Sequence, residues 1–425
     1  MKIINAFRWN EGYVQPCEIR VSDGVITELG HSLSTGEQEE IFDARKTLIV
    51  PGFTDVHVHL REPGGEYKET IETGTNAAIR GGFTTICPMP NTKPVPDSKE
   101  KLEELNSRIR ERANCEVLPY VSITKEQQGE ELTDMKALKE AGAFAFTDDG
   151  VGVQSAAQMK QAMKQAAQLH MPVVAHCEDN SLAGDGVVHE GEISSRLGLS
   201  GIPSSAEAVH IARDVLLAAE TGCHYHVCHV SAKESVQVIR NAKQAGVHVT
   251  AEVTPHHLIL TEKDVTKDDA MFKMNPPLRS EEDKKALIEG LEDGTIDFIA
   301  TDHAPHSEEE KHTSMKEAPF GITGLETAFP LLYTHFVDTG KWSVGQLIRW
   351  MTTKPRAVFS LRRRELEPLH PATFTFIDVG RTEVIDRHTF VSKGKNTPFD
   401  GAKVTGIPVC TMIDGTIAWK EWKKK

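Results

Sequence analysis

The feature that most constrains the fold is an alternation of short β-rich runs with helical segments through the middle of the chain. The β-rich runs are Thr54–His59, Phe83–Cys87, Glu116–Val121, Ala143–Thr147, Val173–His176, Tyr225–His229, Val247–Val253 and Asp297–Thr301. Amphipathic segments between them include Ala156–Leu169, Ala206–Glu220 and Lys233–Ala245. This alternation is typical of a parallel sheet, and the eight runs favour a closed (β/α)₈ barrel over an open doubly wound sheet.

The two ends of the chain carry a different pattern, in which short β runs are separated by turns. These runs are Cys17–Val21, Val25–Leu29, Thr47–Val50, Phe374–Val379, Val404–Ile407, Cys410–Ile413 and Thr416–Trp419. Asp414–Gly415 is a strong hairpin signal between the last two. We therefore expect an α/β protein in which residues 1–50 and 363–425 form a composite β-sandwich domain beside a barrel domain of residues 51–362.

Net charge and cysteine content indicate which partners and which cell compartment to expect. The formal net charge of −14 provides no basic field for nucleic acid or anionic lipid, so neither is expected as a partner. No stretch approaches the roughly 20 apolar residues of a membrane span, and the N-terminus lacks the basic and apolar regions of a signal peptide. The seven cysteines are scattered and include no C-x-x-C pair, as in proteins with reduced thiols. We expect a cytoplasmic protein.

Polar residues follow several of the predicted barrel strands, at the end where barrel enzymes place their active sites. The first strand ends in His57 and His59, which a period of two places on the same side. The other strand ends carry Asp148-Asp149, His176, His229 and Asp302. A single strand-end histidine is more often hydrogen-bonded than ligating, but four histidines with carboxylates indicate a metal site. Imidazole and carboxylate ligands suit Zn²⁺, with Mn²⁺ or Co²⁺ as alternatives, and their number favours two ions.

Five short motifs resemble those of the dihydroorotase family, within the amidohydrolase superfamily. They are residues 53–64 (FTDVHVHLREPG), 89–92 (MPNT), 274–279 (MNPPLR), 300–306 (ATDHAPH) and 319–321 (PFG). The resemblance extends from about residue 45 to about residue 330. It implies a metal-dependent hydrolase that interconverts N-carbamoyl-L-aspartate and L-dihydroorotate.

The resemblance also implies roles for the strand-end residues. One metal is expected on His57, His59 and Asp302, and the second on His176 and His229. Many relatives bridge the two ions with a lysine on strand four, which this chain lacks, so the bridge is assigned to Asp149. Asp148 is the rival, because only one of two adjacent strand residues can face inward.

For the reaction, the resemblance implies that Asp302 is the general base and then the general acid. Arg61 is expected to bind the substrate carboxylate bidentately, since its position two residues after His59 keeps it on the ligand side of the strand. Without the motif, a salt bridge of Arg61 to Glu62 or Glu66 is the alternative. Further substrate contacts are expected from Asn91, Asn275, His306, Phe320 and Gly321, although a turn or cap role is the alternative for both asparagines.

Several other residues are not expected in the chemistry. They are the structural histidines His248, His256, His257 and His303, and the buried thiols of Cys177 and Cys228, which alternation turns away from the site. The polar loop His306–Phe320 is interpreted as a lid over the barrel mouth.

Other functions remain open at this point. Dihydropyrimidinase or hydantoinase and allantoinase open similar cyclic amides, but the first group has less use for Arg61. A non-enzymatic paralogue could keep the barrel as a scaffold for aspartate transcarbamoylase, but this alternative predicts eroded ligands. A homodimer and association with that transcarbamoylase are expected by family analogy alone. Residues 360–374 depart from the family pattern, which affects the expected packing between the domains and not the chemistry.

Overall fold

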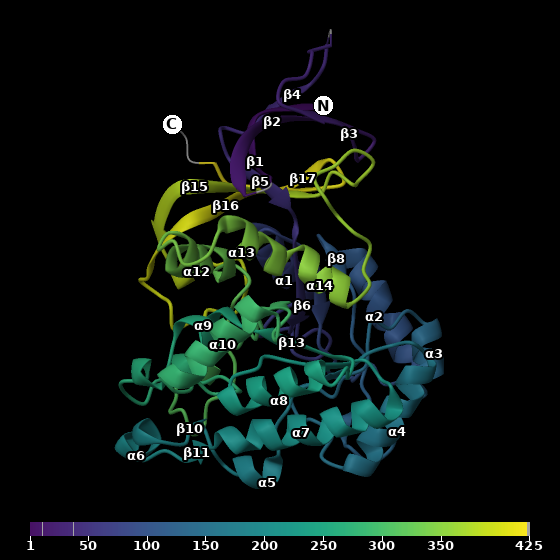
Figure 1. The fold of residues 1–425 in the computed structure, drawn as a ribbon, viewed down its shortest axis with the longest axis vertical. Coiled ribbons are helices and arrows are strands. Elements are labelled where there is room, and N and C mark those ends of the chain that lie inside the picture. Colours follow the sequence, from purple (N-terminus) through teal and green to yellow (C-terminus); the bar gives the residue numbers. More distant parts are fainter. Residues whose placement is uncertain (11, 37, 423–425) are drawn as a thin grey trace.

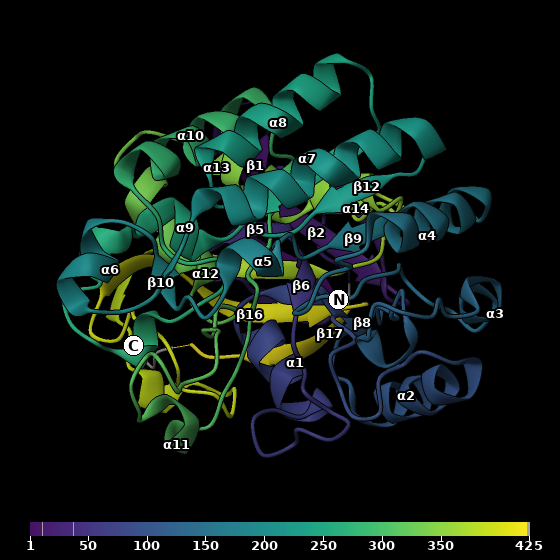
Figure 2. The ribbon, with the colours of Figure 1, turned by 90° about the horizontal axis from the view of Figure 1, so that it is seen from below.

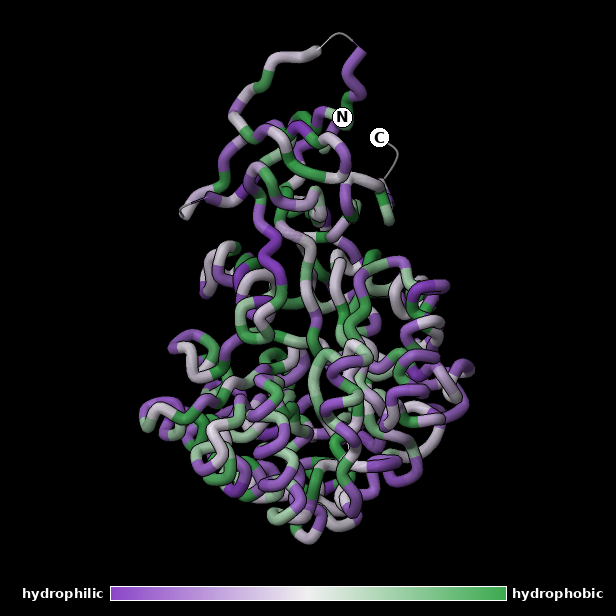
Figure 3. The backbone as a smooth tube through the Cα atoms, turned by 90° about the vertical axis from the view of Figure 1, so that its right-hand side faces the viewer, coloured by the Kyte–Doolittle hydropathy of each residue, from purple (hydrophilic) through white to green (hydrophobic). Residues whose placement is uncertain are grey.

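The computed structural model describes residues 1–10, 12–36 and 38–422. It has a larger lobe of mixed helices and strands and a smaller β lobe, which holds both ends of the chain (Figure 1). Figure 3 shows the two lobes in profile, with the N- and C-termini together on the smaller one. In the described part of the chain, no helix combines the length and apolar character needed to cross a membrane.

The larger lobe is the predicted barrel. Its regular strands are β6 (Phe53–Val58), β7 (Phe83–Pro88), β8 (Glu116–Val117), β9 (Val173–Ala175), β12 (Tyr225–Val227), β13 (Val249–Val253) and β14 (Phe298–Ile299). They form two parallel sheets, ordered β6-β7-β8 and β9-β12-β13-β14. Their side chains are buried on both faces, as expected for strands covered by helices.

Single-residue bridges close these two sheets into a ring. Phe146 pairs in parallel with Val121 on one side and with Val173 on the other, and Val58 pairs with His303. The expected fourth strand, Ala143–Thr147, is therefore present only as an extended segment with one pairing residue. Gly142 and Gly150, with φ of 97° and 91°, bracket this segment and shorten it.

A helix follows each of the eight strand positions and lies on the outside of the ring (Figure 2). These helices are α1 (Ile71–Arg80), α2 (Lys99–Arg112), α3 (Met135–Glu140), α4 (Ala156–Gln168), α7 (Ser204–Thr221), α8 (Lys233–Gln244), α10 (Glu281–Asp293) and α13 (Val344–Met351). Each buries one face, as α8 does with Val236, Ile239 and Ala242. The three helices predicted from the sequence are confirmed, with ends shifted by one or two residues.

Shorter elements lie in the connecting loops. They are α5 (Asn180–Ala183), β10 (Val188–His189), α6 (Glu192–Leu197), β11 (Gly201–Ile202), α9 (Pro255–Ile259), α11 (Glu308–Lys311), α12 (Ala328–Leu332) and α14 (Thr353–Val358). Of these, α11 belongs to the polar loop that was expected at the barrel mouth.

The smaller lobe joins the two chain ends in one sheet, ordered β17-β16-β15-β5-β1-β2-β3, with β4 beside β1. Its strands are β1 (Lys2–Asn10), β2 (Tyr13–Ser22), β3 (Val25–Gly30), β4 (Ile41–Asp43), β5 (Leu48–Pro51), β15 (Phe374–Val384), β16 (Lys403–Ile413) and β17 (Thr416–Lys420). The sheet curls, because Ile26 of β3 and Met412 of β16 share one apolar core. The ends of the chain pair as predicted, and β1 and β4 were not predicted.

The loop between β15 and β16 returns to the barrel. Ile385 and Phe399 pack there against Met274 and Met315. The division into residues 1–50 with 363–425 and residues 51–362 stays a prediction.

Candidate active site

The two histidines of the first strand converge with the carboxylate of Asp302. His59 Nε2 lies 3.0 Å from Asp302 Oδ1, and His57 Nε2 lies 3.4 Å from the same oxygen. Both imidazoles therefore face the same side of the chain, as the period of two predicted, although β6 itself ends at Val58. All three side chains are buried, with at most 6% of each residue exposed.

Asp149 lies between this group and the histidines of strands five and six. Its Oδ1 is 3.5 Å from His57 Nε2 and 4.0 Å from His229 Nε2. His176 Nδ1 lies 3.0 Å from His229 Nε2. Asp149 thus faces both halves of the ligand set, which is the position that a bridging carboxylate needs.

The unsatisfied atoms of this cluster fit a cation. Among the described residues, His57 Nε2, Asp149 Oδ1, His176 Nε2 and His229 Nδ1 are buried without a hydrogen-bond partner. Buried polar atoms are normally paired, since an unpaired one costs about 1–3 kcal/mol. His57 Nε2 in addition faces two carboxylate oxygens, and its other ring nitrogen already has a partner. Burial lowers the pKa of His57, but the surrounding acidic groups, Asp302 and Glu252 among them, outweigh burial and raise it well above its usual value. The Nε2 position therefore favours a positive charge, which either a proton or a metal ion can supply.

Glu252, on β13, is that partner, and the sequence reasoning missed it. Its Oε1 accepts a hydrogen bond from His57 Nδ1 at 2.6 Å, and its Oε2 lies 3.1 Å from His226 Nε2. Burial raises the pKa of Glu252, but the charges and hydrogen bonds of His57 and His226 outweigh burial and lower it to about 2. An ionised Glu252 fixes the His57 tautomer that leaves Nε2 free for a metal. The sequence did contain a sign of this role, because Glu252 is the one charged residue in the β-rich run Val247–Val253.

Asp148 faces the other way. Its Oδ1 accepts hydrogen bonds from the backbone amides of Ile123 and Thr124 at 2.8 and 3.1 Å, and its Oδ2 accepts one from the Thr124 hydroxyl. Burial raises its pKa to about 6. The geometry therefore favours Asp149 over Asp148 as a metal ligand.

A cavity of about 170 Å³ opens above the cluster. Its lining is His59, Arg61, Asn91, Asp149, Gly150, His176, His229, Asn275, Asp302, Ala304, Phe320 and Gly321. Predicted metal ligands and predicted substrate residues thus share one cavity. Two predicted residues, His57 and His306, are buried beside it, at 0% and 4% exposure.

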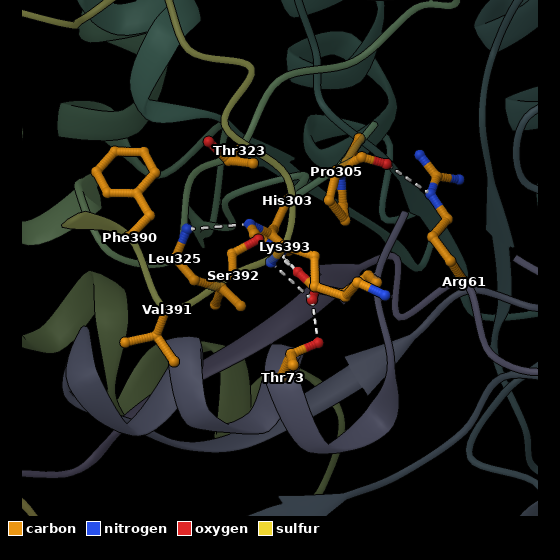
Figure 4. Close-up of polar contacts among 12 residues, drawn as sticks. Arg61, Thr73, His303, Pro305, Thr323, Leu325, Phe390, Val391, Ser392 and Lys393 are labelled. Atoms are coloured by element: carbon orange, nitrogen blue, oxygen red, sulfur yellow. Dashed lines mark hydrogen bonds and ion pairs between the residues drawn. The ribbon is translucent and has the colours of Figure 1, made fainter. Parts of the chain in front are cut away.

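Arg61 reaches the cavity by a route that differs from the expected one. It lies beyond the end of β6 and has a φ of 60°, so strand alternation does not set its direction. Its Nε donates instead to the carbonyl of Pro305 at 3.2 Å (Figure 4). Arg61 lines the cavity, where its guanidinium can bind a carboxylate.

His306 is held by two neighbours. Its Nε2 donates to the Phe320 carbonyl at 2.8 Å, so its Nδ1 is the acceptor for the Lys68 ammonium at 3.2 Å. Arg61 Nη2 lies 3.3 Å from Nε2. Burial, together with the positive charges of Arg61 and Lys68, lowers the pKa of His306 well below its usual value. The ring is neutral, and its Nε2–H lies beside the Arg61 guanidinium without accepting a hydrogen bond from it.

The two predicted asparagines come from different loops. Asn91 Oδ1 accepts from His59 Nδ1 at 3.0 Å, and the other ring nitrogen of His59, Nε2, faces Asp302 Oδ1 at the same distance. Asn275 Nδ2 donates to Glu178 Oε2 at 3.0 Å. Both side chains line the cavity, so neither has only a turn or cap role.

Of the four histidines excluded by sequence, His248 stacks on His224, and two of the other three have hydrogen-bond partners. His303 turns away from Asp302, since Nε2 lies 3.3 Å from Glu69 Oε2 and Nδ1 accepts from the Gly324 amide at 3.1 Å. Figure 4 shows its ring between Leu325 and Ser392. His257 bonds to Thr254 Oγ1 and the Pro276 carbonyl. The exception is His256, whose Nε2 is buried without a hydrogen-bond partner in the described chain.

The two cysteines beside the metal histidines differ. Cys177 Sγ lies 3.0 Å from the Tyr225 hydroxyl, away from the ligand cluster as expected. For Cys228 the expectation from alternation is wrong, because its sulfur lies within 4.8 Å of ligand atoms of His57 and Asp149. Burial raises the pKa of the Cys228 thiol well above its usual value, which keeps it protonated.

A (β/α)₈ barrel whose mouth gathers buried imidazoles and carboxylates under a polar cavity defines a class, the metal-dependent amidohydrolases. A sequence model described as Dihydro-orotase-like matches residues 46–235. Dihydroorotase from Geobacillus sp. (strain WCH70) is 60% identical over 97% of each chain. Dihydroorotase from Bacillus subtilis (strain 168) is 59% identical over 99% of this chain and 98% of the relative. The chain belongs to the dihydroorotase family.

Solved structures of related enzymes share the fold. L-Hydantoinase (dihydropyrimidinase) from Arthrobacter aurescens has a TM-score of 0.89 and 26% identity, over 100% of this chain and 97% of that one. D-Hydantoinase (dihydropyrimidinase) from Thermus sp. has a TM-score of 0.85 and 26% identity, over 99% and 95%. The predicted fold class and the prediction of a cyclic amide hydrolase are confirmed.

Proposed function

We propose that this chain catalyses the reversible, metal-dependent cyclisation of N-carbamoyl-L-aspartate to L-dihydroorotate, a step of de novo pyrimidine (UMP) biosynthesis. The observation that carries the proposal is the cavity, which sets the Arg61 guanidinium and the amides of Asn91 and Asn275 beside the buried ligand cluster. Dihydroorotate has a free carboxylate, which Arg61 can bind, and a cyclic amide, which the metal-ligand cluster can hydrolyse. The dihydroorotases at about 60% identity support the same reaction.

The proposed cofactor is a pair of Zn²⁺ ions. One is assigned to His57, His59 and Asp302 and the other to His176 and His229, with Asp149 between them. When bound there, such ions would lower the pKa of a water molecule toward neutrality and would polarise the amide carbonyl. The unpaired atoms of this cluster and its mixed imidazole and carboxylate chemistry support the assignment.

Asp302 is the proposed general base. Burial raises its pKa, but the positive charges of His57 and His59 and the hydrogen bond from His59 outweigh burial and lower it well below its usual value. Asp302 is therefore a carboxylate when substrate arrives. In the hydrolytic direction it accepts a proton from the attacking water, the amide C–N bond breaks, and the proton passes to the leaving ring nitrogen. Cyclisation reverses these steps.

The cavity residues are assigned to binding. Arg61 pairs with the substrate carboxylate, and Asn91 and His306 are assigned to the same end of the substrate. Asn275 faces the polar edge of the ring, and the Phe320–Gly321 segment covers its face. This arrangement discriminates against dihydrouracil, which has no carboxylate for Arg61.

The experiment is turnover of the purified, zinc-loaded protein on L-dihydroorotate, dihydrouracil and allantoin in parallel, each repeated after chelation. We expect activity on dihydroorotate alone, lost on chelation and restored by metal. Activity on dihydrouracil or allantoin instead would favour the hydantoinase-like or allantoinase-like alternative, which the solved neighbours share in fold. No turnover at all would favour the scaffold alternative.

Assembly and location are further proposals. Family analogy supports a homodimer and an association with aspartate transcarbamoylase in the cytoplasm. The seven described cysteines, all free thiols, agree with a reducing compartment. Light scattering of the purified chain, alone and mixed with the transcarbamoylase, tests both associations.

A further inference from the structure

The loop between β15 and β16 is anchored at the barrel mouth by a buried carboxylate. Ser392 donates its hydroxyl hydrogen bond to Glu69 Oε2, and the Lys393 amide donates to Glu69 Oε1 at 3.1 Å. Glu69 is 0% exposed and also contacts His303 and Thr73. Figure 4 shows Ser392 and Lys393 beside these two residues. A segment of the smaller lobe is thus fixed against the end of strand eight.

Four residues further along, Asn396 enters the scaffold of the cavity. It is 2% exposed. Its Nδ2 donates to the carbonyls of Ala304 and Gly321, both at 3.0 Å, and its Oδ1 accepts from the His306 amide at 2.9 Å. The side chain therefore uses both donors and its acceptor on the backbone of two segments, 304–306 and 320–321.

These two segments form one wall of the cavity, since Ala304, Phe320 and Gly321 all line it. Their backbones are unusually close. Gly321 has a φ of 129°, and a Cβ there would lie 2.6 Å from the Ala304 Cβ. The Ala304 amide bonds to the Ile322 carbonyl at 2.8 Å. A small change in the spacing of the two segments therefore changes the shape of the cavity.

We propose that Asn396 is a positioning residue for substrate, which holds the two wall segments at the spacing that substrate binding requires. The inference rests on the proposed function, because it assigns this cavity to dihydroorotate. Through Asn396 the smaller lobe completes a site whose cavity-lining residues all come from the barrel. Asn396 acts on the wall and not on the reacting atoms, so its loss affects KM more than kcat.

The test compares two variants at this position. Asn396→Ala removes all three hydrogen bonds, and Asn396→Asp keeps the acceptor for the His306 amide but removes both donors. We expect each to raise KM for L-dihydroorotate by about tenfold or more, with a smaller change in kcat and the same bound metal. The measurements are steady-state kinetics, metal content and thermal unfolding.

The matched control is Thr411→Val. Thr411 is also buried in the smaller lobe, and its hydroxyl donates to the Ile79 carbonyl of the barrel at 2.6 Å, on α1 and outside the cavity lining. We expect it to lower the unfolding temperature without changing KM. Asn396 variants that lower the unfolding temperature but keep KM within twofold of wild type would overturn the proposal, because Asn396 would then be structural only.

Amide hydrogen exchange of residues 303–306 and 319–323 gives a readout that needs no substrate. We expect faster exchange there in Asn396→Ala and unchanged exchange in Thr411→Val. If the wild-type protein fails to turn over dihydroorotate, the proposed function fails by itself, and exchange still decides the role of Asn396. Unchanged exchange in Asn396→Ala would reject that role whatever the substrate.

Discussion

The two ends of the barrel bury similar polar residues in opposite ways. His229, at the mouth, has a buried Nδ1 without a hydrogen-bond partner among the described residues. His226, three residues earlier on the same strand, has both ring nitrogens paired, with Thr250 Oγ1 at 2.8 Å and Glu252 Oε2 at 3.1 Å. His224, further from the mouth, also bonds to Thr250 and stacks on His248 at 4.1 Å.

Buried charged residues show the same difference between the two ends of the barrel. Arg356, at the closed end of the barrel, is 4% exposed but donates to Thr54 Oγ1, Thr85 Oγ1 and the Arg362 carbonyl. At the mouth, Asp149 keeps an oxygen with no donor among the described residues. A buried polar residue therefore does not mark a functional site by itself. Imidazoles and carboxylates that converge with unpaired atoms among them do, as His57 Nε2 and Asp149 Oδ1 show at 3.5 Å from each other.

The largest effect is expected at Asp302. Asp302→Asn removes the carboxylate that accepts the proton and should reduce kcat by about a thousandfold or more, while most of the metal stays bound through the remaining ligands. Steady-state kinetics with metal analysis measures both. Wild-type-like turnover in this variant would remove the general-base assignment.

Asp149 and Asp148 offer a comparison between neighbours. Asp149→Asn should lower metal content and reduce turnover by about a hundredfold or more, because it removes the carboxylate that faces both halves of the cluster. Asp148→Asn should mainly lower stability, since Asp148 holds the Ile123 and Thr124 amides. The reverse pattern, in metal analysis and thermal unfolding, would assign the bridge to Asp148.

Glu252 connects the two regions, because it contacts His57 at the mouth and His226 below it. Glu252→Gln keeps the size of the side chain but removes the charge that orients His57. Metal affinity should fall about 10–100-fold, as for other carboxylates that hydrogen-bond to a metal-binding histidine. Competition with a chelator measures the affinity. An unchanged affinity would show that Glu252 stabilises the strand and does not orient His57 for metal binding.

A substitution of Arg356 tests the end of the barrel opposite the mouth. Arg356→Met leaves the Arg362 carbonyl and the buried hydroxyls of Thr54 and Thr85 without their donor, so the free energy of unfolding should fall by about 1–3 kcal/mol. Denaturant unfolding measures this loss. The kcat and KM values should not change, and a large kinetic effect would contradict the separation of the two ends.

The last prediction is a pH dependence of stability at His224, with no effect on turnover. Burial, with the neighbouring charges of His248 and His226, lowers the pKa of His224 to about 3 from its usual 6.5. The unfolded chain then binds a proton that the folded chain does not, so this contribution to stability is complete above pH 6.5 and declines as the pH falls toward 3. His224→Asn should flatten the slope of unfolding free energy by at most about 1.4 kcal/mol per pH unit. Parallel slopes would refute the shift.

Much of this architecture could be predicted from local sequence. Period and burial give the barrel strands, and His57-x-His59 with the other strand-end residues gives the ligand set. Short elements held by distant pairing could not be predicted. The Ala143–Thr147 segment was predicted as a strand, but only one of its residues pairs, and the three residues of β4, whose place depends on β1, were not predicted.

Contacts between distant loops were also beyond sequence reasoning. Asn396 reaches the cavity from the other lobe, and nothing in its local sequence indicates Ala304 or Gly321 as partners. Arg61 was predicted in the cavity for a reason that does not hold, because its backbone leaves β6 before reaching it. The direction of the Cys228 side chain was predicted wrongly for the same reason. Side chains alternate between the two faces only within a strand, and β12 ends at Val227.

The most direct measurement of the central claim is a zinc titration of the metal-stripped protein, with calorimetry and dihydroorotate turnover followed together. We expect that two ions bind per chain, that both are lost when His57 and His176 are replaced together by alanine, and that activity becomes maximal only as the second ion binds. Full activity with one ion bound, or turnover without metal, would contradict this expectation.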